Sequence, residues 1–380
     1  MGDVIKFNCP PMVDNGLKYI ENVIRSGKLG GDGEYTKKCS KWMEEKFKCK
    51  KVLLTTSGSM ALDMAAILCD IKPDDEVILP SFTFSSTANS FVLRGARLVF
   101  VDINPRTMNI DEKLVEQAVT ERTKVIIPVH YAGVSCNMDD IMNIASRHNI
   151  LVVEDAAQGV MSSYKGKCLG TIGDIGCYSF HETKNFSMGE GGAVVINNEK
   201  FLDRAEIIRE KGTNRSQFFR GLVDKYTWVD IGDSFLPSDL NAAYLWAQLE
   251  AADDIINKRI DIWNRYSEAF KIYNEAGKIK LPSVPCECKH NGHLFYIKFK
   301  SLDVRTDYIK YMKRNDIMCS FHYIPLHSAP AGLQYGRFFK DDIYTTSESE
   351  KLVRLPLYYN LSNNDVERVI ECTKRFIENL

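Results

Sequence analysis

Residues 176–195, GCYSFHETKNFSMGEGGAVV, place one lysine in a context suited to nucleophilic chemistry. Cys177, Ser179 and His181 alternate as side chains do on one face of a strand. Lys184 follows at once, and the glycines that come next permit a tight turn before another apolar run. A lysine beside a sheet edge and a glycine turn can lose its water, which lowers its pKa and frees a nucleophilic amine. Most single lysines are solvated surface charges, so the hypothesis depends on this context.

A second cluster, VVEDAAQG at residues 152–159, supplies a carboxylate and an amide. Asp155 lies at the carboxyl end of an otherwise apolar strand, and Gln158 follows one turn later. In a partly dry site, a carboxylate and a cationic ligand nitrogen each stabilise the charge of the other. From these residues alone, a helix cap is an equally good interpretation of Asp155.

A third cluster, TTSGSMAL at residues 55–62, is suited to binding an anion. An apolar strand runs into Ser57, Gly58 and Ser59 and then directly into an apolar helix. Main-chain N–H groups at a helix start bind anions, and Gly58 lets the backbone approach a ligand closely. An ordinary cap at Ser59 is the alternative. The run matches neither a Walker loop nor GxGxxG, which argues against NTPases and dinucleotide-binding enzymes.

Taken together, the three clusters supply an anion site, a carboxylate for a heterocyclic nitrogen and an amine for a Schiff base. These are the groups that pyridoxal phosphate requires. The sequence therefore predicts an enzyme with pyridoxal 5'-phosphate as its cofactor.

The elements that must position these groups follow from the hydrophobic pattern. Runs such as VIIPV and ILVVE are apolar on both faces, as in a parallel sheet that is buried under helices. Functional groups are then expected at the carboxyl ends of the strands. The pattern predicts seven strands: Val52–Thr56, Glu76–Leu79, Arg97–Asp102, Lys124–Val129, Ile150–Glu154, Gly176–His181 and Ala193–Ile196.

We expect three units along the chain: a large α/β domain with an N-terminal arm at 1–236, a long linking helix at 237–276, and a small α+β domain at 277–380. The helix is expected to begin after Pro237 and to end near Gly277. The small domain should contain strands at Leu294–Phe299 and Met318–Tyr323, and helices at Asp303–Asn315 and from Asn364. The stretch KGTNRSQFFRGLVDKYTW has no period and is predicted to be a functional loop.

Composition excludes several classes of protein. Lysine plus arginine (49) nearly equals aspartate plus glutamate (50), so no basic field is expected to attract nucleic acid or a membrane. No run of about 18 apolar residues and no signal-like start occurs, which favours a cytoplasmic protein. The eleven scattered cysteines contain no CxxC and are expected to be free thiols. Cys286, Cys288, His290 and His293 lack the usual zinc spacing, so no metal is expected.

Along essentially its whole length, the sequence resembles the sugar-nucleotide aminotransferases, which have the type I fold of aspartate aminotransferase. The segments that carry the resemblance are SGKLGGDGEYTKK, PSFTFSSTAN, FVDI, PVHYAG, VVEDAAQ, SFHETKN, GEGG, LNAAYLWAQL and HYIPLH. The resemblance implies a PLP-dependent transferase fold of type I, with a mostly parallel seven-stranded sheet domain and a smaller C-terminal α+β domain. It also implies a homodimer whose active sites are each built from two subunits.

The resemblance also assigns roles to the cofactor-site residues. Lys184 would carry the Schiff base, and Asp155 would pair with the pyridinium nitrogen. Gln158 would contact the phenolic-oxygen side of the ring, and Phe84 would stack on its face unless it is simply a core residue. The phosphate would be held by three groups: Ser59, the Met60 main-chain amide and Ser179.

On the substrate side, the resemblance places His327 near the sugar, although a loop-capping role is an alternative. Many relatives carry an asparagine before the long helix that reaches the partner's phosphate, whereas here Ser234 stands near that position. We therefore expect contacts across the dimer to come from Lys211, Arg215 or Tyr226.

The reaction that the resemblance implies moves the amino group of L-glutamate to C4 of dTDP-4-dehydro-6-deoxy-D-glucose. The products are 2-oxoglutarate and dTDP-4-amino-4,6-dideoxy-D-galactose, for a cell-surface polysaccharide of the enterobacterial common antigen type. A sibling enzyme with another sugar, amination at C3 or the C4 epimer as its product remains open. Related sugar 3-dehydratases carry histidine in place of the lysine, and a non-catalytic relative would lack the lysine or the aspartate. Lys184 and Asp155 argue against both.

Overall fold

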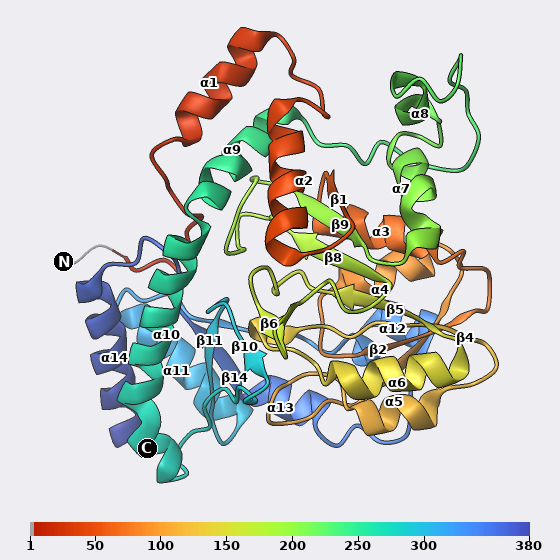
Figure 1. Ribbon diagram of the computed structural model, residues 1–380. Helices are drawn as coiled ribbons and strands as arrows, with labels where there is room; N and C mark the ends of the chain where they lie inside the picture. Colours follow the sequence, from red (N-terminus) through yellow and green to blue (C-terminus); the bar gives the residue numbers. More distant parts are fainter. Residues whose placement is uncertain (1–3) are drawn as a thin grey trace.

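The computed structural model describes residues 4–380, and the largest sheet in that range has eight strands in the order β1-β9-β8-β5-β4-β2-β3-β13 (Figure 1). β9 is antiparallel to both of its neighbours, and every other neighbouring pair is parallel. All strands except β9 therefore share one direction. The strands are β1 (Lys51–Thr55), β2 (Glu76–Pro80), β3 (Arg97–Val101), β4 (Thr123–Ile126), β5 (Leu151–Asp155), β8 (Ile175–Ser179), β9 (Gly192–Ile196) and β13 (Gly336–Phe338).

All seven strands that the sequence predicts in the sheet are present, with ends displaced by a few residues. The eighth, β13, was not predicted, and it extends the sheet by pairing in parallel with β3. Its three residues are too few to show a period of two. A Cβ at Gly336 would lie 2.8 Å from Leu98 Cβ, so glycine allows the strand to approach β3 closely.

Helices cover both faces of this sheet (Figure 1). Val52 and Leu54 of β1 belong to one core and Leu53 to the other, because side chains alternate along a strand. Both faces are therefore buried, as the apolar strands predicted. One face packs against α2 (Glu34–Phe47), α5 (Glu112–Ala118), α6 (Met138–His148) and α9 (Asp239–Glu250), and the other against α3 (Gly58–Leu68), α4 (Ser85–Val92) and α7 (Leu202–Arg209).

The single helix expected at 237–276 is instead two helices, α9 and α10 (Ala252–Glu275). Ala251 separates them with φ −98° and ψ 16°, outside the helical region. Neither glycine nor proline marks the break in the sequence, so no local signal predicted it. The break allows α9 to pack on α1 (Gly16–Ser26) and α2, while α10 packs on the C-terminal part of the chain.

The C-terminal part has a core of its own, built on a sheet of β11 (Phe295–Lys298), β14 (Leu352–Leu355) and β12 (Ser320–Phe321). The two predicted strands correspond to β11 and β12, and β14 between them was missed. Helices α11 (Leu302–Arg314) and α14 (Asn363–Glu378) lie close to their predicted positions. Tyr266 and Phe270 of α10 complete this core.

The remaining elements are short. A small sheet contains β6 (Ser163–Tyr164), β7 (Lys167–Cys168) and β10 (Cys288–Lys289). No helix within residues 4–380 is long and apolar enough to cross a membrane. Over the same range, no three His, Cys, Asp or Glu side chains gather as metal ligands would. Short helices are α8 (Arg215–Phe219), α12 (Pro330–Tyr335) and α13 (Thr345–Lys351), with 3-10 turns at Tyr131–Gly133, Glu199–Phe201 and Leu326–Ser328.

Candidate active site

A cavity of about 800 Å³ lies at the carboxyl ends of the central parallel strands. Its walls come from the ends of β5 and β8, the starts of α3 and α4, and the region of β12 and β14. This is the position at which open α/β sheets bind ligands. Six of the predicted site residues line the cavity: Ser59, Phe84, Asp155, Gln158, Ser179 and Lys184.

Lys184 lies in the turn that follows β8, where its main-chain N–H donates to His181 O at 2.9 Å. Its half-buried side chain lines the cavity. Burial lowers the pKa of Lys184 from its ordinary 10.5 to about 8; Asp155 opposes this decrease and Arg354 adds to it. An appreciable fraction of this amine is therefore unprotonated near neutral pH.

Asp155 is the last residue of β5 and is 6% exposed. One carboxylate oxygen accepts from Thr87 Oγ1 at 2.7 Å, and the other accepts from the Ala157 N–H at 3.1 Å. The bond to Ala157 stabilises a turn rather than capping a helix, because no helix directly follows β5 and the next element is β6. The same carboxylate also lines the cavity, so the turn interaction and a ligand-binding role are compatible.

Gln158 and Phe84 lie near one tyrosine that the sequence analysis did not single out. Gln158 Oε1 accepts from the Ala132 N–H at 2.7 Å, and its Nε2 donates to the hydroxyl of Tyr323 at 3.1 Å. The Phe84 ring is 59% exposed, so it is not a core residue, and its centroid lies 6.4 Å from that of Tyr323. The three side chains form an aromatic and amide wall of the cavity.

The helix start at α3 has the features of an anion site, but its cap is Ser57 rather than Ser59. Ser57 Oγ accepts from the Met60 N–H at 3.1 Å, so the predicted Met60 amide already has a partner. The first helical bond runs from the Ala61 N–H to Ser57 O. The N–H groups of Gly58 and Ser59 precede this first bond in the chain, so neither has a partner within the helix.

Two hydroxyls flank that helix start. Ser59 Oγ lies 2.6 Å from Ser86 Oγ, and both serines line the cavity. A Cβ at Gly58 would lie 2.8 Å from the Cβ of Ser179, so only glycine lets this serine approach the helix so closely. Main-chain N–H groups and hydroxyls at a helix start form a donor set that fits a phosphate.

His327 is not brought into the cavity. Its Nδ1 lies 2.7 Å from Ser81 Oγ, and its Nε2 lies 3.1 Å from a carboxylate oxygen of Asp342. The first contact holds the segment after β12 beside the end of β2, and the second holds it to the loop after β13. These contacts match the loop-holding alternative for His327.

Lys211, Arg215 and Tyr226 also lie away from the cavity, in the segment around α8. The Arg215 guanidinium lies 5.1 Å from the centroid of the Phe219 ring. Ser234 forms an isolated antiparallel bridge with Glu210, which ties the end of the segment to its beginning. Within one chain, no residue of this segment reaches the cofactor-site residues.

Arg354 is a functional candidate that the sequence analysis missed. It lies on β14 and lines the cavity, where Nη2 donates to Phe321 O at 2.8 Å and the guanidinium lies 4.7 Å from the Phe7 ring centroid. Its Nε is buried and has no hydrogen-bond partner within residues 4–380. Burial lowers the pKa of Arg354. A lone charge inside the apolar run LVRLPL was the signal that could have identified it.

The fold and this cavity define the class of enzyme: a type I aminotransferase, with a helix start, a carboxylate and a desolvated lysine at the carboxyl ends of parallel strands. The chain belongs to the DegT/DnrJ/EryC1/StrS aminotransferase family, whose model matches residues 11–374.

Two relatives of the chain have names that refer to polysaccharide or sugar biosynthesis. The spore coat polysaccharide biosynthesis protein SpsC of Bacillus subtilis is 34% identical over 337 residues, 87% of this chain and 86% of SpsC. GDP-perosamine synthase of Caulobacter vibrioides is 29% identical over 369 residues, 96% of each chain. The PLP form of the sugar aminotransferase Spr1654 of Streptococcus pneumoniae superposes with a TM-score of 0.90 at 27% identity, covering 99% of each chain.

These relationships confirm three predictions: the type I fold, transaminase activity and pyridoxal phosphate as the cofactor. The general function, without the particular sugar or product, is likewise established: the chain is a sugar aminotransferase. The residues present fit the cofactor, because the cavity offers donors for a phosphate, a buried carboxylate for a ring nitrogen and an amine of lowered pKa.

Proposed function

We propose that the chain transfers the amino group of L-glutamate to C4 of dTDP-4-dehydro-6-deoxy-D-glucose, giving dTDP-4-amino-4,6-dideoxy-D-galactose and 2-oxoglutarate. The main observation that supports an amino transfer is the cavity, which brings together Lys184, Asp155 and the start of α3. The pKa of Lys184 is about 8. When bound, pyridoxal phosphate supplies an electron sink for the carbanion that forms when the amino acid loses its α-proton.

The residues of the chain would divide the work as follows. Lys184 binds the cofactor covalently and then moves a proton, because a lysine of lowered pKa is a base and an acid near neutral pH. Asp155 would pair with the ring nitrogen and favour its protonated form. Phe84 covers one face of the ring. The Gly58 and Ser59 N–H groups and the hydroxyl of Ser179 would hold the phosphate.

Arg354 would bind a carboxylate of the amino donor. Its guanidinium lines the cavity, and its buried Nε lacks a partner within the described chain, so a carboxylate could satisfy it. A planar guanidinium also matches a carboxylate in geometry. Because Phe7 and the Phe321 carbonyl hold the side chain from two sides, its position is largely fixed before a donor binds.

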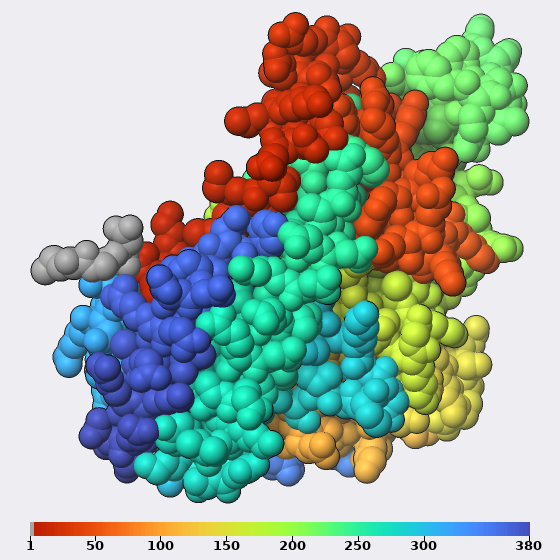
Figure 2. Space-filling view, turned by 60° about the vertical axis from the view of Figure 1, so that its left-hand side comes forward, coloured from red at the N-terminus to blue at the C-terminus, as the bar shows by residue number. Residues whose placement is uncertain are grey.

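We further propose that two protomers form a homodimer through the projecting segment around α8. Figure 2 shows this green segment and the red N-terminal helices standing above the rest of the molecule. Phe219 and Trp228 in the segment are 70% and 76% exposed, which is a large apolar surface for a solvated loop. Lys211, Arg215 or Tyr226 of one protomer would then complete the cavity of its partner and contact the nucleotide diphosphate.

A cytoplasmic location is part of the proposal. It is supported by the cysteines at all eleven positions, which are free thiols in the structure. Unpaired cysteines in such number are usual in a reducing compartment. Nucleic acid is not proposed as a partner, because the chain carries a net charge of −1.

The reaction is tested by mass spectrometry of the products formed from a panel of 4-oxo and 3-oxo nucleotide sugars with L-glutamate. The dTDP-linked 4-oxo sugar should be the best substrate by kcat/KM. Because one relative is named GDP-perosamine synthase, a GDP-linked 4-oxo sugar is the second candidate, and its preference would overturn the first. Proton NMR then fixes the epimer: a small H3–H4 coupling indicates an axial nitrogen, and a large one refutes the galacto product.

The cofactor lysine is tested separately. Borohydride should fix a pyridoxyl group on the peptide that contains SFHETKN, and Lys184→Ala should abolish this labelling together with turnover. Lys50, an exposed lysine paired with Glu199, provides the control, since Lys50→Ala should leave labelling unchanged. Labelling of any other lysine would refute the assignment.

A further inference from the structure

A buried carboxylate adjoins the proposed catalytic one on the same strand. Glu154 precedes Asp155 on β5, and the alternation of side chains turns it toward the opposite face of the sheet. Its side chain is 0% exposed, yet within residues 4–380 no lysine or arginine pairs with it. Three main-chain N–H groups of one turn donate to it instead: Gly170 at 2.8 Å, Ile172 at 2.6 Å and Gly173 at 2.6 Å.

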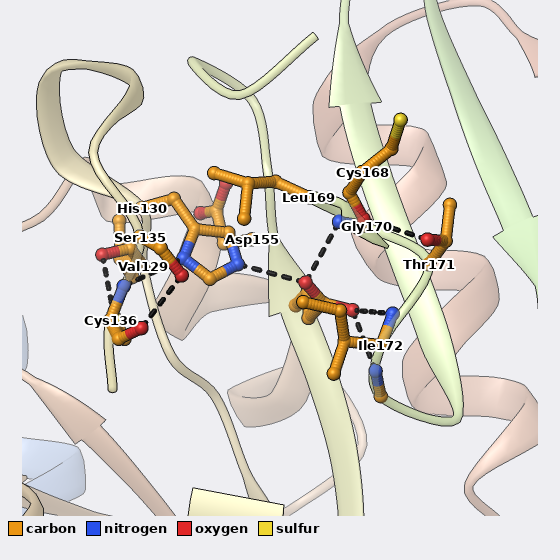
Figure 3. Close-up of polar contacts among 12 residues, drawn as sticks. Val129, His130, Ser135, Cys136, Asp155, Cys168, Leu169, Gly170, Thr171 and Ile172 are labelled. Atoms are coloured by element: carbon orange, nitrogen blue, oxygen red, sulfur yellow. Dashed lines mark hydrogen bonds and ion pairs between the residues drawn. The ribbon is translucent and has the colours of Figure 1, made fainter. Parts of the chain in front are cut away.

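The fourth donor is His130, which is labelled in Figure 3. Its Nε2 lies 2.9 Å from Glu154 Oε2. Four donors thus face the two oxygens of one carboxyl group. A protonated carboxyl would direct its own O–H at one of these donors, so Glu154 must be ionised to satisfy all of them. Hydrogen bonds to the charged form compensate for the missing cation.

The hydrogen bonds also fix the tautomer of His130. The Cys136 N–H donates to Nδ1 at 3.2 Å, so this nitrogen presents a lone pair (Figure 3). The proton therefore lies on Nε2, which donates it to Glu154. Gaining a second proton would break the Cys136 bond. Contacts at both nitrogens therefore hold the His130 ring in one orientation.

His130 is bonded to both acidic residues of β5. Its side chain holds Glu154, and its main-chain N–H donates to Asp155 O at 3.1 Å. The Asp155 N–H in turn donates to Pro128 O at 2.9 Å. The same loop holds Gln158, through the bond from the Ala132 N–H to Oε1 at 2.7 Å. A displacement of the His130 ring would therefore be transmitted directly to the end of β5.

We propose that His130 and Glu154 are positioning residues, which clamp the end of β5 from the side opposite the cavity and so hold the Asp155 carboxylate against the cofactor's ring nitrogen. This inference rests on the proposed role of Asp155. Thr87 and Ala157 orient the carboxylate locally, whereas the clamp fixes the strand end that carries it. Neither positioning residue touches the cavity.

Two substitutions of His130 distinguish its proposed positioning role from a mere contribution to buried packing. In His130→Gln, the amide nitrogen can occupy the place of Nε2 and still donate to Glu154. In His130→Asn, the shorter amide cannot reach the carboxylate, although it can still accept from the Cys136 N–H. Glu154→Gln replaces one acceptor by an NH2 group that faces donors on every side.

Asp102→Asn is the matched control. Asp102 is also a buried carboxylate that no lysine or arginine within residues 4–380 pairs with. Main-chain N–H groups donate to it instead: Ile343 at 3.0 Å, Tyr344 at 2.9 Å and Thr345 at 2.8 Å. It directly follows β3 and does not line the cavity. Its substitution should lower stability to a similar degree without touching β5.

The readout is the 15N chemical shift of holoenzyme loaded with ring-15N pyridoxal phosphate, which reports the protonation of the ring nitrogen directly. We expect His130→Asn and Glu154→Gln to shift the signal toward the unprotonated form. Each should also lower kcat for the glutamate half-reaction by about ten- to a hundredfold with little change in KM. His130→Gln should stay within about threefold of the unmodified enzyme, and Asp102→Asn should leave the shift unchanged.

Asp155→Asn, measured alongside, distinguishes the two levels of inference. If it leaves the ring-nitrogen signal unchanged, the proposed role of Asp155 is wrong, and the positioning role of His130 and Glu154 is then wrong as well. If Asp155→Asn moves the signal while His130→Asn and Glu154→Gln do not, the clamp alone is refuted. An equal shift in Asp102→Asn would likewise refute it, because general destabilisation would then account for the effect.

Discussion

Lys184 should titrate far below an ordinary lysine in the apoenzyme, and two substitutions should move its pKa in opposite directions. Burial lowers this pKa to about 8, the carboxylate of Asp155 raises it, and the guanidinium of Arg354 lowers it further. Asp155→Asn removes the stabilising anion, so the pKa should fall below 8. Arg354→Gln removes the repelling cation, so the pKa should rise toward 10.5.

The size of the effect follows from the titration. Near neutral pH, a lysine with a pKa of about 8 is unprotonated in about a tenth of the molecules, against roughly 0.03% for one at 10.5. Lys184 should therefore react about 300-fold faster than an equally accessible surface lysine. Asp155→Asn can raise its unprotonated fraction at most about tenfold further, because that fraction then approaches unity.

Competitive labelling measures this directly. Apoenzyme is treated with trace isotopic acetic anhydride across a range of pH, then fully acetylated in denaturant, and the isotope ratio at Lys184 is read by mass spectrometry. Lys50, half-exposed on the surface, serves as the internal reference. A midpoint above about pH 10 for Lys184, or an upward shift in Asp155→Asn, would refute the reasoning.

Three further measurements test the site. Because the folded-state pKa of Lys184 lies below its unfolded value, the folded protein binds fewer protons between about pH 8 and 10.5 and gains stability as pH rises through that window. Lys184→Met should therefore raise the free energy of unfolding of the apoenzyme by up to about 3 kcal/mol near neutral pH, an advantage lost above about pH 10; urea denaturation at several pH values measures it. Arg354→Gln should raise KM for L-glutamate at least about tenfold and leave KM for the nucleotide sugar nearly unchanged, since a charge-assisted bond is lost; steady-state kinetics with each substrate varied will show whether it does. Gly58→Ala should weaken the binding of pyridoxal phosphate at least about tenfold, because the new Cβ would lie 2.8 Å from Ser179 Cβ; fluorescence titration measures the affinity, and unchanged binding would mean that the phosphate lies elsewhere.

The central sheet and its chemistry could be predicted because both depend on local sequence. Val and Ile runs apolar on both faces indicate buried parallel strands; Asp155 is the last residue of one of them, and Lys184 lies in the turn that follows another. β13 and the break at Ala251 could not be predicted, because three residues show no period and an alanine gives no signal for a break. They arise from packing against distant parts of the chain.

The roles of Arg354 and His327 also depended on distant partners. Phe7 and the carbonyl of Phe321 hold Arg354 in the cavity wall, and both are remote from it in sequence. His327 was expected near the sugar, but the structure shows its ring held by Ser81 and Asp342. A motif places a residue in the chain, whereas only the fold decides which of its neighbours satisfy its hydrogen bonds.

The charges of the cavity suit an enzyme that must accept two anionic substrates in turn. His293 and His322 lie in its wall, but burial and the nearby cations Lys184 and Arg354 hold both pKa values well below the usual range, so they add no charge. The charged side chains of the wall are then Lys184, Arg354, Asp155 and Glu190. If Asp155 pairs with the ring nitrogen and Lys184 binds the cofactor, Arg354 is the cation of the wall that remains to attract a carboxylate. An arginine in this place keeps its proton when a substrate leaves, so it carries the same charge in both halves of the cycle. A lysine beside Lys184 could lose its proton and with it that charge.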